Sequence, residues 1–147
     1  MPVRISGPPE GVRGSRVDVS LLRARARRLL GAVGHGRAEL SIALVDDSAM
    51  RTLNRDWRAR DRATDVLSFS LLEGAGSAHR GELLGDVVIS VETAARQAAA
   101  RHRSLDDEVL RLLVHGLLHV LGHDHEHEDE ASVMRAEQRR LWRAAQA

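Results

Sequence analysis

Three histidines near the end of the chain have the spacing of a catalytic metal site. His115 and His119 are four residues apart, so on a helix both imidazoles project from one face and can bind one ion. Gly122 follows, and a glycine just past a helix can turn the chain back in the left-handed conformation. His125 can then return to the same ion as a third ligand. Three histidines leave one tetrahedral position open, which is typical of a catalytic zinc.

The residue after the first histidine decides which chemistry this spacing supports. The spacing is that of the metzincin proteases, in which a glutamate follows the first histidine and acts as the general base. This chain has Gly116 there, so a peptidase of that mechanism would lack its proton acceptor. A bound zinc would still lower the pKa of a water toward about 7. The motif therefore indicates metal-assisted hydrolysis and argues against proteolysis.

Several side chains beside the motif leave details of the site open. His123 and His127 are alternatives to His125 as the third ligand, although the position of His125 after the glycine turn favours it. Asp124 is a candidate to orient a ligand or accept a proton, or simply to stabilise the turn. The general base is either Asp124 or a water. A purely structural zinc, closed by Asp124 or His123 as a fourth ligand, is the alternative to a catalytic one.

The composition limits the classes of protein and of metal site. The chain has 147 residues and a formal net charge of +1, which suits one domain and excludes a polycation that would coat RNA. It has no cysteine, so disulfides and thiolate metal sites are excluded. We find no apolar run long enough to cross a membrane and no signal-peptide pattern, so we expect a cytoplasmic protein that does not contact membranes.

The histidines lie on a helix predicted for residues 105–121, which begins after a capping sequence at Ser104. Leucine and valine occupy nearly all sides of this helix, so it must be central and buried. The other predicted helices are 18–33, 46–57, 92 to the turn at His102, and 130–145, and the predicted strands are 3–5, 40–45, 66–71 and 85–90. These elements predict one α+β domain over residues 1–147, with about four strands in a mixed sheet packed with about five helices.

A charged loop before the strand at 66–71 supplies a second candidate functional group. Arg58, Arg60 and Arg62 alternate along it and are candidates to hold a phosphate, although an exposed loop arginine is often only solvated. Asp65 is a candidate to pin this loop. Every basic side chain of the chain is arginine, which suits bidentate phosphate contacts, but a base-composition bias of the genome is the simpler explanation.

Two further sets of residues are expected to be structural. Met50 and Trp57 lie on one side of their predicted helix, so we expect both in the core. Four arginines of the first helix are expected to form a solvated face, not an RNA-facing patch: Arg23, Arg25, Arg27 and Arg28.

Three segments together resemble the YbeY family of single-domain bacterial endoribonucleases. The family's metal motif, H-G-x-x-H-x-x-G-[aromatic]-D-H, is similar to residues 115–125. An aromatic-Arg pair followed by Asp and T-D-V-L-S-F-P resembles residues 57–70, and G-D-[IV]-x-I-S resembles residues 85–90. The segments occur in family order, and the resemblance covers nearly the whole chain. The departures are His123 where an aromatic residue is usual, and Ala63 and Ser70 where proline is common.

The resemblance implies a zincin-like helix and one Zn2+ ion bound by His115, His119 and His125, with catalytic roles for His115 and Arg58. It implies a single-strand-specific, metal-dependent endoribonuclease that acts in 3′-end maturation of 16S ribosomal RNA and in ribosome quality control. The implied partners are ribosomal RNA and the small ribosomal subunit, with ribosomal proteins and a ribosome-maturation GTPase. The alternative is a ribosome-assembly factor with a largely structural zinc site and weak nuclease activity.

Overall fold

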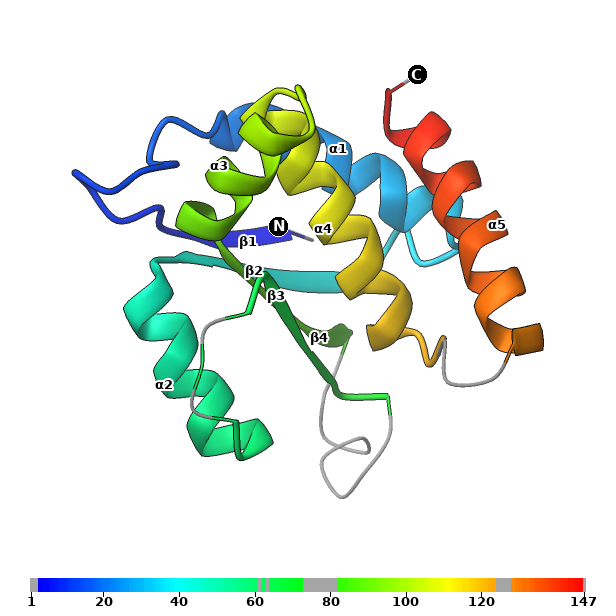
Figure 1. Cartoon of the computed structure of the whole chain (residues 1–147). Coiled ribbons are helices and arrows are strands. Elements are labelled where there is room, and N and C mark those ends of the chain that lie inside the picture. Colours follow the sequence, from blue (N-terminus) through cyan, green and yellow to red (C-terminus); the bar gives the residue numbers. More distant parts are fainter. Residues whose placement is uncertain (1–2, 61, 63, 73–81, 124–127, 147) are drawn as a thin grey trace.

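Four strands and five helices are present in the part of the chain that the computed structural model describes, residues 3–60, 62, 64–72, 82–123 and 128–146 (Figure 1). The strands are β1 (Val3–Ser6), β2 (Glu39–Val45), β3 (Val66–Ser70) and β4 (Leu83–Ser90). The helices are α1 (Val19–Ala32), α2 (Asp47–Arg58), α3 (Val91–Ala100), α4 (Leu105–Val120) and α5 (Glu128–Gln146). The predicted α+β class, with a four-stranded sheet and five helices, is confirmed.

The strands form one mixed sheet in the order β1-β2-β4-β3. β1, β2 and β4 are parallel, whereas β3 runs antiparallel to β4 and forms an edge of the sheet. Alternate residues of a strand face opposite sides of the sheet. Ser68 and Ser70 of β3 therefore point toward α4, and Leu67 and Phe69 point toward α2, as their alternation predicts.

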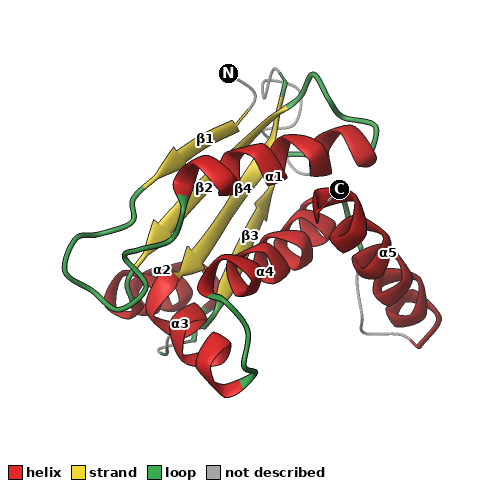
Figure 2. Ribbon diagram, turned by 90° about the horizontal axis from the view of Figure 1, so that it is seen from above, coloured by secondary structure: helices red, strands yellow, loops and turns green. Residues whose placement is uncertain are grey.

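The main core lies between the sheet and the helices on one of its faces. α1 and α4 cover that face, α5 packs on the outer side of both, and α2 lies on the opposite face (Figure 2). Leu110, Leu113 and Leu117 of α4 are fully buried, so the prediction of a central, buried helix is confirmed. None of the helices in the described part of the chain is long and apolar enough to span a bilayer.

Trp57 corrects one expectation about the core. Met50 is fully buried on the α2 face of the sheet, but the Trp57 side chain is 67% exposed. Trp57 lies in the last turn of α2, where the neighbouring strand is the sheet edge, and its ring packs edge-on with the Phe69 ring at a centroid distance of 6.2 Å. The apolar pattern shows which side of a helix faces the protein, but it does not show where the covering sheet ends.

Two arginines of α1 join it to other helices. Arg25 pairs with the Asp107 carboxylate at 3.0 Å, and its side chain is only 13% exposed. Arg28 donates to the Ala145 carbonyl of α5 at 3.1 Å. The expected solvated face is thus wrong for Arg25, which lies where α1 meets the start of α4.

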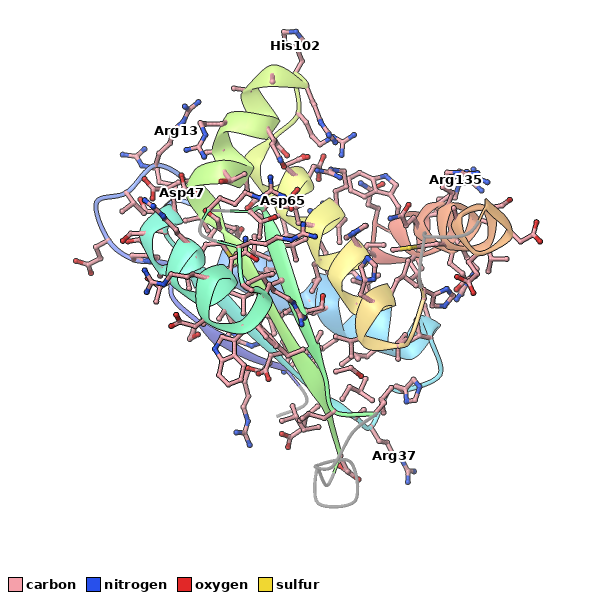
Figure 3. All side chains as sticks on the ribbon, turned by 60° about the horizontal axis from the view of Figure 1, so that its bottom comes forward. Arg13, Arg37, Asp47, Asp65, His102 and Arg135 are labelled. Atoms are coloured by element: carbon pink, nitrogen blue, oxygen red, sulfur yellow. The ribbon has the colours of Figure 1, made fainter. Side chains whose placement is uncertain are left out.

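Asp47 fastens α2 to the start of α3 (Figure 3). Its carboxylate accepts hydrogen bonds from Ser90 at 2.6 Å and Thr93 at 2.7 Å, and it pairs with Arg96 at 2.8 Å. Burial raises the pKa of Asp47, but these hydrogen bonds and the arginine charge outweigh burial, so the pKa lies below its usual value. The ionised carboxylate therefore stabilises the folded protein.

Asp47→Asn is expected to lower the free energy of unfolding by about 1 to 3 kcal/mol at neutral pH, because hydrogen bonds to a charged group are lost. The pKa in the folded protein is below the unfolded value of 3.8, so this stabilisation is present above that value and disappears as the pH falls through the folded pKa. Urea unfolding at about pH 7 and pH 3 measures the difference. Equal losses at both pH values would contradict the assignment to the charged form.

Candidate active site

The two histidines of α4 meet at their outer ring nitrogens. His115 Nε2 and His119 Nε2 are 3.0 Å apart, and the ring centroids are 4.5 Å apart. Two nitrogens that each lie about 2.0 to 2.1 Å from a tetrahedral zinc are separated by roughly 3.4 Å. Both rings are half-buried, and they already have nearly the separation that two ligands of one ion need. The two rings thus lie together on one face of α4, with a separation that fits a zinc ion, and their role as metal ligands stays a prediction.

The glycine turn after α4 is also confirmed. Gly122 has a φ of +94°, its N–H donates to the His119 carbonyl, and the next N–H, of His123, donates to the Leu118 carbonyl. This pair of bonds is the Schellman ending, which turns the chain back at the end of a helix. The chain therefore turns back after α4, as the glycine predicts.

The third ligand stays a prediction. His125, Asp124 and His127 lie outside the described residues, and within the described ranges no group of three or more metal-binding side chains is found. His123 is described, and it lines a cavity with Asp129 and Glu130, apart from the cavity that contains His115. This placement weakens the case for His123 as a competing ligand.

Gly116 lies where α4 touches the sheet. A Cβ atom there would stand 2.6 Å from Val87 Cγ1, 3.1 Å from Ser68 Oγ and 3.2 Å from a methyl of Val66. Ser68 Oγ donates to the Gly116 carbonyl at 2.9 Å, and Ser70 Oγ donates to the Val120 carbonyl at 2.7 Å. Because residue 116 has no side chain and two serines bond to the helix, α4 lies close to β3. The same contacts set the distance of the two histidines from the strand.

The arginine loop and the two histidines line one cavity of about 730 Å³. Its walls include Arg58, Arg60, Arg62, His115 and His119. The predicted phosphate-binding residues and two of the three predicted metal ligands are thus brought together, although they are more than 50 positions apart in the sequence. Such a cavity can hold an anionic group between cationic side chains and a metal.

Arg58 is fixed on the outer side of the edge strand. Its Nη2 donates to the Ser68 carbonyl at 2.6 Å, and its guanidinium carbon lies 5.0 Å from the centroid of the Phe69 ring. The side chain is exposed and therefore accessible to a ligand in the cavity.

The loop that carries the arginines is held at both ends. Asn54 is 3% exposed, its side-chain amide donates to the Arg62 carbonyl at 2.8 Å, and its own carbonyl accepts from the Arg60 N–H. The Asp65 carboxylate accepts from the Val66 N–H at 2.8 Å and from the side-chain amide of Gln97 on α3 at 3.2 Å. Asp65 therefore pins the loop as predicted, whereas sequence analysis missed Asn54.

Gln138 of α5 is a second residue that sequence analysis missed. Its side-chain amide lies 3.0 Å from His115 Nδ1, the ring nitrogen that points away from His119. A neutral imidazole that binds metal through Nε2 carries its proton on Nδ1, which then donates to the oxygen of an amide turned to accept it. A polar residue on the inward stripe of α5, which includes Met134, Leu141 and Ala145, is the signal in the sequence that identifies this position.

Comparisons with known proteins agree with one another. The family model described as endoribonuclease YbeY matches residues 16–146. A protein of this name from Anaeromyxobacter dehalogenans is 51% identical over 136 residues, covering 92% of this chain and 67% of the relative. Another, from Pelotomaculum thermopropionicum, is 44% identical over 138 residues, covering 92% and 91%. The solution structure of TM1509 from Thermotoga maritima matches with a TM-score of 0.66 and 25% identity, covering 97% of this chain and 88% of that one.

Proposed function

Because this chain belongs to the YbeY family, whose members are named endoribonucleases, we propose that it is a zinc-dependent hydrolase that cleaves single-stranded RNA. Its substrate in the cytoplasm would be the precursor of 16S ribosomal RNA, matured at the 3′ end on the small ribosomal subunit. Ribosomal proteins and a ribosome-maturation GTPase would be its partners there, and ribosome quality control would be part of the same role.

The observation that carries the proposal is that two convergent imidazoles and three arginines line one cavity. Phosphodiester cleavage needs an activated oxygen nucleophile and positive charge around the phosphate, and this cavity has residues suited to both. A peptidase needs a general base that this helix lacks, because Gly116 has no side chain and no room for one.

Each residue then has a definite task. His115 and His119 would hold the zinc through Nε2, with His125 as the predicted third ligand. The bound zinc would lower the pKa of a water and polarise a phosphoryl oxygen. Gln138 would fix the His115 ring, and Arg58 would neutralise the charge that builds on the phosphate in the transition state. Asp124 or a water would accept the proton.

Arg58→Gln tests the proposal, because it removes the charge while keeping much of the length of the side chain. We expect cleavage of single-stranded RNA to fall by about 100- to 1000-fold, the usual cost of losing one group that stabilises transition-state charge. Zinc content should not change, because Arg58 is exposed and its guanidinium rests on the Ser68 carbonyl and the Phe69 ring. Single-turnover cleavage and metal analysis are the measurements.

The matched control for this test is Arg55→Gln. Arg55 is on the same helix, is exposed, pairs with Asp56 and does not line the cavity, so its loss should leave cleavage unchanged. Full nuclease activity in Arg58→Gln would remove this arginine from the mechanism. A metal-loaded wild-type protein that cleaves no single-stranded RNA would refute the proposed function itself.

A further inference from the structure

A second cavity, of about 500 Å³, lies between α4 and α5 and is strongly basic. Its walls include Arg103, Arg111, Arg135, Arg139, Arg143 and Trp142, and no acidic residue lines it among those that the structure describes. The net charge of the whole chain is only +1, so five guanidinium groups in one groove, of which Arg111 is paired with the Glu108 carboxylate, are a marked local concentration of charge. This distribution favours an anionic ligand.

Three of these arginines form a stripe along the exposed side of α5. Arg135, Arg139 and Arg143 recur every four residues, which places successive side chains about 6 Å apart along the helix axis. Figure 3 shows the first of them, Arg135, projecting from α5 into solvent. No described carboxylate pairs with any of the three, whereas the neighbouring Arg140 is paired with Glu137 at 2.8 Å. The charges on the stripe are therefore available to a ligand.

The other two arginines are held in place at the wall of the groove. The guanidinium carbon of Arg103 lies 5.2 Å from the centroid of the Trp142 ring, a cation–π contact. Arg111 Nε donates to the fully buried Glu108 carboxylate at 2.7 Å, and its Nη2 donates to Gln97 at 3.2 Å. These contacts fix both side chains before any ligand arrives, which reduces the entropic cost of binding.

The basic groove begins where the candidate active site ends. The His115 ring lines the first cavity with His119, while its Nδ1 is 3.0 Å from Gln138, which lines the second. The contact between His115 and Gln138 thus joins the wall of one cavity to the wall of the other. A strand with one phosphate beside the histidine pair would pass directly onto α5.

We propose that the groove between α4 and α5 binds the phosphate backbone of the RNA strand on one side of the cleaved bond. Arg135, Arg139 and Arg143 would contact successive phosphates, and Arg103 would add a fixed charge above Trp142. This inference rests on the proposed function for the position of the strand. Continuity with the His115 site favours RNA over an acidic protein as the ligand. An RNA strand bound at the histidine pair would extend into the groove, whereas binding of an acidic protein would not require contact with the His115 site.

The test replaces Arg135, Arg139 and Arg143 together by glutamine, which removes the charge without placing carboxylates near the C-terminal end of α5. Binding to a fluorescent single-stranded RNA of about 12 nucleotides is followed by anisotropy across salt concentrations. Each phosphate contact on a single strand contributes about 0.7 to the slope of log K against log salt, so losing three contacts should lower the magnitude of this slope by about 2. Between about 50 and 200 mM salt, the affinity advantage of the wild type should then shrink by roughly 20-fold.

The matched control is the triple replacement of Arg13, Arg16 and Arg37 by glutamine. These exposed arginines change the net charge equally but lie away from the groove, and Figure 3 shows Arg13 and Arg37 far from Arg135. Its salt slope should match the wild type. The control variant should also cleave single-stranded RNA at the wild-type rate, because its three arginines line neither cavity.

Equal salt slopes for the groove variant and its control would overturn the inference. Unchanged RNA affinity with lost binding of polyglutamate would also overturn it, and would assign the groove to an acidic protein. The proposed function fails separately, if the wild type binds RNA through the groove but cleaves none of it.

Discussion

His115→Ala is expected to remove the proposed zinc and to slow RNA cleavage by about 1000-fold or more, because a bound zinc would supply several kcal/mol of transition-state stabilisation. His115 holds the centre of the site, since one ring nitrogen faces His119 and the other faces Gln138. Without the His115 ring, His119 is the one imidazole of the pair that remains to bind the metal. Metal analysis of the purified variant, together with single-turnover cleavage of a single-stranded RNA, measures both effects.

Two companion variants make this result specific. Gln138→Ala should weaken zinc binding by a smaller amount, about 10- to 100-fold, because it removes only the support of the ligand. His123→Ala should keep the metal, because His123 lines a different cavity. Loss of metal in this variant would identify His123 as a ligand.

His115→Ala protein that keeps stoichiometric zinc would refute the two-histidine site. Intact 16S maturation in cells carrying a metal-free variant would favour the assembly-factor alternative.

Gly116→Glu introduces the residue that a metzincin peptidase has at this position. We expect it to unfold the protein or to lower the free energy of unfolding by more than about 4 kcal/mol. Even the Cβ atom would stand 2.6 Å from Val87 Cγ1, and the rest of the side chain would have to enter the contact between α4 and the sheet. Burying a carboxylate there without a partner adds to the cost. Peptidase activity should not appear. Urea unfolding and a peptidase assay measure the two outcomes.

The smaller replacement separates steric crowding from charge. Gly116→Ala should cost about 1 to 3 kcal/mol by overpacking, despite the better helix propensity of alanine. Adding Val87→Ala removes the methyl that the new Cβ would meet, so the double variant should be more stable than the sum of the two single losses predicts. Strict additivity in this cycle would show that α4 does not touch the sheet at Gly116.

Much of the fold follows from local patterns. The bounds of α4 follow from Ser104, the apolar run and Gly122, and the two faces of β3 follow from simple alternation. The convergence of His115 and His119 follows from helical periodicity alone. These features depend on residues close together in the sequence, which is why the sequence predicts them.

The features that the sequence did not reveal depend on contacts between distant segments. Trp57 is exposed because α2 ends beside the edge of the sheet, and the position of that edge is set by the strand order. Gln138 meets His115 only because α5 returns along α4, 23 positions later in the chain. In the sequence, Gly116 indicates only that a catalytic group is absent, whereas its packing against Val87 shows a steric requirement as well.

The bond between Arg58 and the Ser68 carbonyl has a consequence for solubility. β3 is the last strand of the sheet, and an unpaired strand edge is a template on which a second polypeptide can add. A guanidinium attached to the outward-facing carbonyl of this strand places a positive charge where an incoming backbone would have to bind. The same arginine that we assign to the reaction would thus also guard the protein against aggregation through β3.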